Sequence, residues 1–212
     1  MKLLHVIATP RKAGSTTLQI SNAFLSELAS QCPDLEVTTV DLFHDDLPAA
    51  AGTNIDVKYN LMAGIDVDSS HQESWSQIEE LIQQFVAADC YLVSSPMWNL
   101  SVPYALKYYI DCLIQPGYVF SYNEQGHPVP LVNGRRMVCV TSRGSDYGPS
   151  GPAHLDFQEP YLRAIFGFIG ITDMTFVHAQ PADISALRDG VLAAAVDQAR
   201  ELAAAMMSDA AA

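Results

Sequence analysis

The chain alternates between short apolar runs and longer segments in which apolar side chains recur every three or four positions. Five stretches predict strands, and a segment with helical spacing follows each of them: residues 3–8, 36–42, 90–95, 136–141 and 172–178. Strands without polar alternation are usually buried on both faces, as in a parallel sheet. The pattern therefore predicts one α/β domain over residues 1–212, with helices on both faces of a doubly wound, five-stranded parallel sheet.

Two segments interrupt this alternation. Residues 44–70 are rich in Asp, Pro, Gly and Asn and have no steady period, so we expect a long surface excursion, which is either a lid or interface segment or a loosely packed insert. Tyr118, Phe120 and Tyr122 then alternate with smaller side chains before a turn at residues 123–126, which predicts a small β-hairpin insert. We expect this aromatic row to line a pocket or a subunit contact and not the main core.

The loop after the first strand predicts an anion site. Thr9 and Arg11 lie in this loop, and Ser15, Thr16 and Thr17 open the next helix. Hydroxyl groups and unpaired N–H groups at a helix amino terminus bind phosphate well, although Ser15 or Thr16 could instead act only as the helix cap. GxxxxGK[ST] and GxGxxG patterns are absent. A phosphate loop at this place favours a flavodoxin-like strand order, 2-1-3-4-5.

The loops after the third and fourth strands predict the rest of a ligand site. The third strand ends at Pro96, and Met97, Trp98 and Asn99 follow, which combine a flat aromatic surface with an amide. The alternative is a turn in which Trp98 only covers the end of the sheet. The fourth strand ends in a turn of small residues over 141–145, where backbone groups can approach a ligand. In open α/β sheets, ligands bind at this edge.

Composition narrows the class of protein. Among 212 residues, 11 are basic and 24 acidic, which gives a formal charge of −13 that disfavours nucleic acid and anionic membrane partners. No apolar run approaches the length of a membrane span. The four cysteines and six histidines lack metal or disulfide spacing, so we expect free thiols and no metal. The first residues predict a strand and not a signal peptide, which favours the cytoplasm.

These loops resemble the FMN-dependent NADH-azoreductase family, whose members are also quinone oxidoreductases of flavodoxin-like fold. The resemblance runs nearly end to end and is strongest in three stretches: Pro96-Met97-Trp98-Asn99, Thr141-Ser142-Arg143-Gly144, and Pro160-Tyr161-Leu162 through residues 167–173. Trp98 stands where the family often has Tyr, Leu100 where Phe is common, and Ser145 where a second Gly is usual. Ser145 would restrict the turn if its φ had to be positive.

The resemblance implies an enzyme that transfers a hydride from NADH or NADPH through non-covalent FMN to a quinone or azo compound, with ping-pong kinetics. It also implies a homodimer with the site at its interface, where Phe120 and Tyr122 would belong to the substrate pocket. No protein nucleophile or proton donor is implied. The alternative is a flavodoxin-type carrier of single electrons. The expected FMN contacts are Thr9, Ser15, Thr16 and Thr17 at the phosphate, Met97, Trp98, Asn99 and Leu100 at the ring, and Ser142, Arg143, Gly144 and Ser145 at its pyrimidine edge.

Overall fold

The computed structural model describes residues 1–49, 52–65 and 72–210. Its centre is a parallel sheet of five strands in the order β2-β1-β3-β6-β7, which confirms the predicted order. The strands are β1 (Lys2–Ile7), β2 (Glu36–Asp41), β3 (Cys90–Pro96), β6 (Arg136–Ser142) and β7 (Asp173–Ala179). Because all five run in the same direction, their carboxyl ends meet at one edge, where Pro96 pairs with Ser142.

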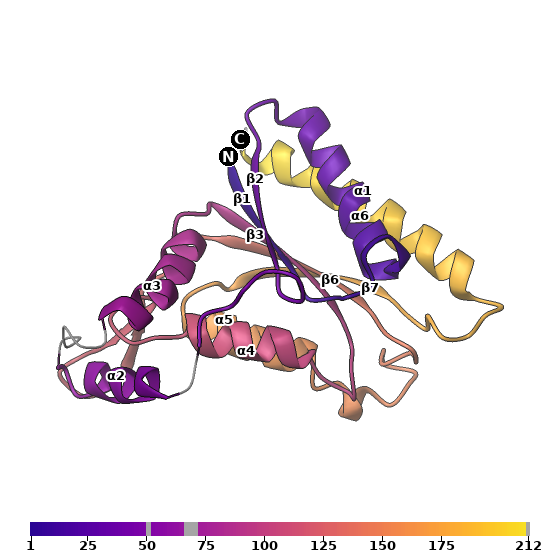
Figure 1. Ribbon diagram of the computed structural model, residues 1–212. Coiled ribbons are helices and arrows are strands. Elements are labelled where there is room, and N and C mark those ends of the chain that lie inside the picture. The colour runs from indigo at the N-terminus through magenta and orange to yellow at the C-terminus, as the bar shows by residue number, and fades with distance from the viewer. Residues whose placement is uncertain (50–51, 66–71, 211–212) are drawn as a thin grey trace.

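Helices cover both faces of this sheet (Figure 1). On one face lie α1 (Thr16–Gln31) and α6 (Arg188–Ala210), which pack side by side. On the other face lie α3 (Gln72–Val86), α4 (Tyr104–Leu113) and α5 (Glu159–Phe168). Each layer has its own apolar cluster, with Ile20, Phe24 and Leu28 toward α6 and with Trp75, Leu106 and Phe166 on the opposite side. Alternate side chains of each buried strand enter one cluster or the other.

The described part of the segment 44–70 includes a helix that we did not expect. It contains the helix α2 (Thr53–Met62), which contacts α3 at the outside of the fold, while residues 50–51 and 66–70 lie outside the described part of the chain. The sequence prediction missed this helix because its apolar residues are not gathered in one stripe: Ile55, Tyr59 and Met62 are exposed, whereas Val57 is buried on another side.

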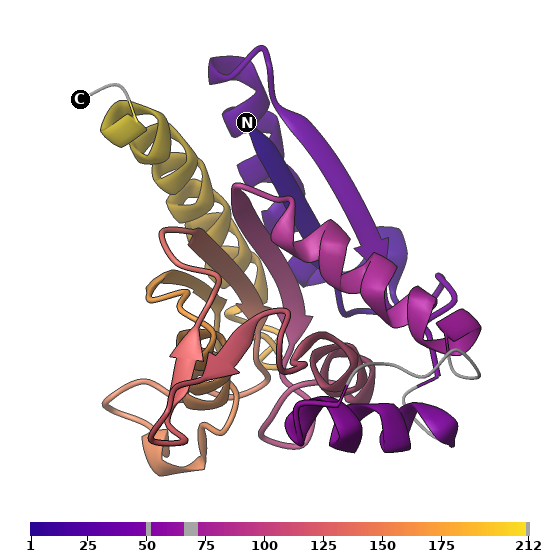
Figure 2. The same cartoon turned by 90° about the vertical axis from the view of Figure 1, so that its left-hand side faces the viewer.

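The predicted hairpin is present as β4 (Phe120–Tyr122) and β5 (Pro128–Pro130), which pair antiparallel (Figure 2). Phe120, however, is buried in the main core, where its ring lies 4.8 Å from that of Phe168 at the end of α5. The expectation that the aromatic row avoids the core is therefore wrong for Phe120. The hairpin folds back onto α5 and so gains a core that two isolated strands lack.

Three of the four cysteines are buried and Cys32 is partly buried, and all four are free thiols as predicted. Two short 3-10 helices complete the described elements, η1 (Lys12–Gly14) before α1 and η2 (Ala153–Leu155) before α5. Among the described residues, no helix is long and apolar enough to cross a membrane.

Candidate ligand site at the carboxyl edge of the sheet

A cavity of about 720 Å³ lies at the carboxyl ends of β1, β3 and β6 and against the start of α6. Its volume is within the range of small-molecule and cofactor sites. Eight of the residues that the sequence predicted for a ligand line this cavity: Thr9, Ser15, Thr16, Met97, Trp98, Ser142, Arg143 and Gly144. The three loops that the sequence singled out therefore meet in one site.

The amino end of α1 forms one end of the cavity. Ser15 is the N-cap of this helix, and its Oγ accepts hydrogen bonds from the Leu18 N–H at 3.3 Å and from the Thr9 hydroxyl at 3.3 Å. Arg11 also lines the cavity there. The positive end of the helix dipole, the hydroxyl groups and the guanidinium together favour an anion such as a phosphate monoester.

Thr17 is predicted to contact the same anion, but its side chain points elsewhere in the structure. It is fully buried and does not line the cavity. The Thr17 Oγ1 lies 2.7 Å from the Oγ of Ser142, so a hydrogen bond joins the first turn of α1 to the end of β6. Thr17 thus holds the anion site beside the β6 loop.

The loop after β3 supplies an aromatic wall. Met97 and Trp98 line the cavity, whereas Asn99 and Leu100 do not. Asn99 and Leu100 have φ angles of 47° and 72°, in the left-handed region that disfavours residues with a side chain. The Trp98 ring packs on Phe43 at 5.6 Å between centroids. A planar ligand that enters the cavity would meet this braced indole ring.

The β6 loop contributes mainly backbone to the cavity. The side chain of Arg143 is only 2% exposed, and its Nε and Nη1 donate to Gln158 and Asp156 in the protein interior. A Cβ on Gly144 would collide with a carboxylate oxygen of Asp183, so a larger residue at this position would have to displace the Asp183 side chain. Ser145 lies outside the cavity lining and does not have a positive φ, so serine fits there.

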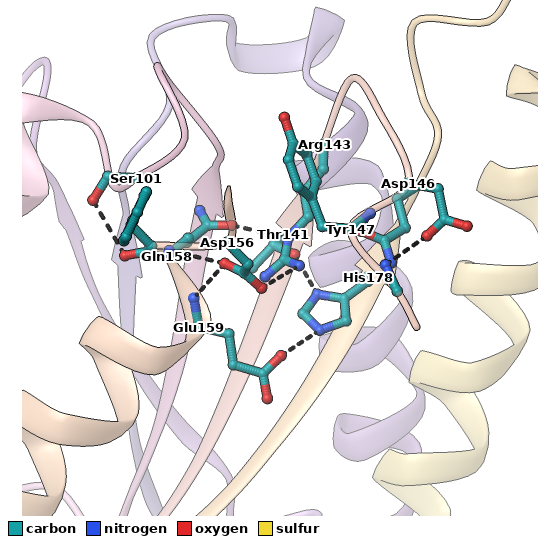
Figure 3. A network of polar contacts seen from close by, with 12 residues as sticks. Ser101, Thr141, Arg143, Asp146, Tyr147, Asp156, Gln158, Glu159 and His178 are labelled. Carbon is teal, nitrogen blue, oxygen red and sulfur yellow. Dashed lines mark hydrogen bonds and ion pairs between the residues drawn. The ribbon is translucent and has the colours of Figure 1, made fainter. Parts of the chain in front are cut away.

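A row of hydrogen-bonded side chains runs from the end of β6 to α5, on the face of the sheet that α5 covers (Figure 3). The His178 Nδ1 lies 2.6 Å from the Thr141 hydroxyl, and its Nε2 lies 2.8 Å from a Glu159 carboxylate oxygen. Burial, with help from the Arg143 charge, holds the pKa of His178 below its usual value. The imidazole is therefore neutral near pH 7.

One wall of the cavity escaped the sequence prediction. It consists of residues from α1, from the loop after β7 and from the start of α6: Gln19, Ala182, Asp183, Arg188, Asp189 and Leu192. No local pattern marks the residues after β7, because tertiary contacts bring them to the site. The N–H groups of Ala182 and Asp183 donate to the Arg143 and Gly144 carbonyls at 2.8 and 3.2 Å, and the start of α6 arrives through its packing against α1. Phe120 and Tyr122, in contrast, were predicted for a substrate pocket and do not line the cavity of this chain.

A doubly wound parallel sheet with an anion cradle after β1 and a cavity at its carboxyl edge defines a mononucleotide-binding class of flavodoxin-like proteins. The family model for the flavodoxin-like fold matches residues 1–203. The chain therefore belongs to the flavodoxin-like family, in the branch that holds the quinone oxidoreductases and azoreductases described next, which confirms the resemblance.

Two curated relatives and one solved structure define this branch. The chain is 34% identical over 203 residues to an FMN-dependent NADH:quinone oxidoreductase of Desulfotalea psychrophila, covering 95% of this chain and 96% of the relative. It is 35% identical to a protein of the same name from Nitratidesulfovibrio vulgaris, covering 95% and 97%. An FMN-dependent NADH-azoreductase from Bacillus anthracis, solved in complex with FMN, has a TM-score of 0.87 at 26% identity and covers 97% and 99%.

Proposed function

We propose that the chain, as one domain over residues 1–212, is an FMN-dependent oxidoreductase that takes a hydride from NADH or NADPH and reduces a quinone or an azo compound. The observation that carries this proposal is the continuity of the cavity, which joins an anion cradle to an aromatic wall and a backbone edge. FMN has a phosphate, a flexible linker and a planar ring, which match these three parts in order. The names of the relatives support the same activity.

The residues present fit FMN. Thr9, Ser15 and Thr16, at the amino end of α1, would hold its phosphate, and Arg11 adds a positive charge there. Met97 and Trp98 would border its ring. The loop after β6 would face the pyrimidine edge with the Gly144 N–H, because the Arg143 N–H already donates to the Ala179 carbonyl at 3.0 Å. Hydrogen-bond donors at this edge stabilise negative charge. When bound, the flavin supplies the hydride-accepting and hydride-donating group, and the protein binds and orients it.

The site offers no side chain that must act as a nucleophile. Among the described residues, no group of three or more His, Cys, Asp or Glu side chains is placed to hold a metal ion. The nicotinamide and the acceptor would occupy the same cavity in turn, which gives ping-pong kinetics. We place the protein in the reducing cytoplasm, and the free thiols fit this assignment.

We also propose a homodimer. Tyr122 is 46% exposed on the hairpin and does not reach the cavity of its own chain. In a dimer its ring would complete the substrate pocket of the partner, in agreement with the expected position of the hairpin near an interfacial site.

Anaerobic titration tests the function. The FMN-loaded protein should lose its visible flavin absorbance when NADH or NADPH is added and regain it when a quinone or azo dye follows. A protein that binds FMN but is not reduced by either nicotinamide would be an electron carrier. A protein that binds riboflavin as tightly as FMN would contradict the role of the α1 cradle.

A further inference from the structure

The segment Asp156–Gln158, just before α5, contacts both loops that would hold the flavin ring (Figure 3). None of its three residues lines the cavity. The segment is far in sequence from the end of β3, yet it forms hydrogen bonds with the ends of both β3 and β6. Its contacts therefore decide how these two loops are placed relative to each other.

Gln158 makes the central contacts. Its side chain is fully buried, and its Nε2 donates to the carbonyl oxygens of Ser95 at 3.2 Å and Pro96 at 3.0 Å. Its Oε1 accepts a hydrogen bond from the Arg143 Nε at 3.1 Å. A single planar amide thus bridges the last residues of β3 and the loop after β6, and its two ends have opposite hydrogen-bonding roles.

The neighbouring residue holds the strained part of the β3 loop. The Phe157 N–H donates to the Leu100 carbonyl at 3.0 Å, and the Ser101 hydroxyl donates to the Phe157 carbonyl at 3.3 Å. Leu100 and Asn99 adopt positive φ angles, a conformation that is unfavourable for a residue such as Leu. Such a conformation persists only where surrounding contacts enforce it.

Asp156 fixes the segment itself. One of its carboxylate oxygens accepts from the backbone N–H groups of Gln158 at 2.9 Å and Glu159 at 3.1 Å, and the other pairs with Arg143 at 2.9 Å. The Arg143 Nη2 is buried without a partner in the described structure. Because an uncompensated buried charge is costly, the guanidinium is strongly tied to this segment.

We propose that Gln158 is a positioning residue that sets the spacing between the loop Met97–Leu100 and the loop Ser142–Gly144, and so the width of the slot for the planar ring. The residue acts through the Ser95 and Pro96 carbonyls and through Arg143, without touching the ring. This inference rests on the proposed function, because it assigns the slot to the flavin ring.

The competing explanation is that Gln158 only stabilises the fold, and the chain offers a matched control. Gln115 is only 2% exposed, so it is buried like Gln158. Its Nε2 donates to two backbone carbonyls, those of Asp111 at 2.7 Å and Cys112 at 3.1 Å. Gln115 lies just after α4, and its side-chain hydrogen bonds reach neither loop. Gln115→Ala therefore removes the same kind of hydrogen bonds from an equally buried glutamine elsewhere.

The experiment compares FMN with lumiflavin, which has the ring without the ribityl phosphate, in wild type, Gln158→Ala, Gln158→Glu and Gln115→Ala. In Gln158→Ala, both affinities should fall by the same factor of about ten, and the fully loaded protein should be reduced by NADH roughly 10 to 100 times more slowly. The FMN to lumiflavin affinity ratio stays unchanged, because the α1 cradle is intact. Gln115→Ala should retain wild-type affinities and rates.

Gln158→Glu separates the two ends of the amide. It keeps an acceptor for Arg143 but places an oxygen against the Ser95 and Pro96 carbonyls, so the losses should equal those of Gln158→Ala. Wild-type ring affinity in either Gln158 variant, or equal losses in Gln115→Ala, would overturn the positioning role. A wild-type protein that binds neither flavin would instead overturn the proposed function, so the two failures are distinguishable.

Discussion

A buried histidine, His5 in β1, should contribute to the loss of stability in acid. Its Nε2 lies 2.7 Å from the Ser94 hydroxyl, which lies 2.6 Å from the Ser21 hydroxyl, and Ser21 donates to the Thr17 carbonyl at 3.1 Å. Because the Ser21 proton is used on that carbonyl, Ser94 donates to Ser21, and His5 must donate to Ser94. The structure therefore requires a proton on Nε2 of the imidazole.

The size of the effect follows from the pKa of this group. Burial lowers the pKa of His5 from 6.5 to about 4, although Asp41 opposes the shift. As the pH falls, the unfolded chain binds a proton on His5 at a higher pH than the folded chain does. The contribution of His5 to the free energy of unfolding is therefore complete above pH 6.5 and is lost as the pH drops toward 4. With 1.36 kcal/mol for each pKa unit, the loss from His5 is about 2 kcal/mol at pH 5 and about 3 kcal/mol at pH 4.

Urea unfolding from pH 7 to pH 4 measures this loss. Gln at position 5 keeps an N–H donor for Ser94 but does not titrate, so the stability of His5→Gln should fall less steeply with acid than that of wild type, by the amounts above. Other titrating groups, including His178, are common to both proteins and cancel in the comparison. His127→Gln, at an exposed position on the hairpin, is the control and should follow wild type. Parallel curves for wild type and His5→Gln would refute the assignment of a neutral, buried His5.

Three further outcomes are expected. Ser15→Ala removes the N-cap acceptor of the Leu18 N–H, so it should lower the free energy of unfolding by about 1 kcal/mol. In flavin titrations it should weaken FMN binding by about 2 kcal/mol and leave riboflavin binding nearly unchanged. Equal losses of affinity for both flavins would contradict a phosphate cradle. Thr17→Val leaves the Ser142 hydroxyl without its partner, so denaturant unfolding should show a loss of about 1–3 kcal/mol with an unchanged FMN to riboflavin ratio. Sedimentation should show a dimer, and a fully active monomer would exclude an interfacial pocket. Tyr122→Ala should slow the reduction of the acceptor without weakening FMN binding.

The order of the sheet and the position of the ligand loops could be predicted because they depend on local patterns. Unbroken apolar runs such as the one in β3 mark strands buried on both faces, and hydroxyl residues after β1 mark a helix amino end. The helix α2 could not be predicted in this way, since its apolar residues alternate with polar ones over residues 55–61 and lie on both sides of the helix. The burial of Phe120 depends on contact with α5, and no neighbouring residue in the sequence indicates that contact.

Residues 141–144 explain why the residue types of the site were easier to predict than their roles. Three side chains of this motif form hydrogen bonds with other elements: Thr141 with His178, Ser142 with Thr17, and Arg143 with Asp156 and Gln158. At Gly144, the Asp183 carboxylate occupies the space that a Cβ would fill. The side chains anchor the loop, and its backbone is thereby presented to the cavity at a fixed position. A substitution in this motif should therefore act on the placement of the loop, even where the altered side chain never meets a ligand.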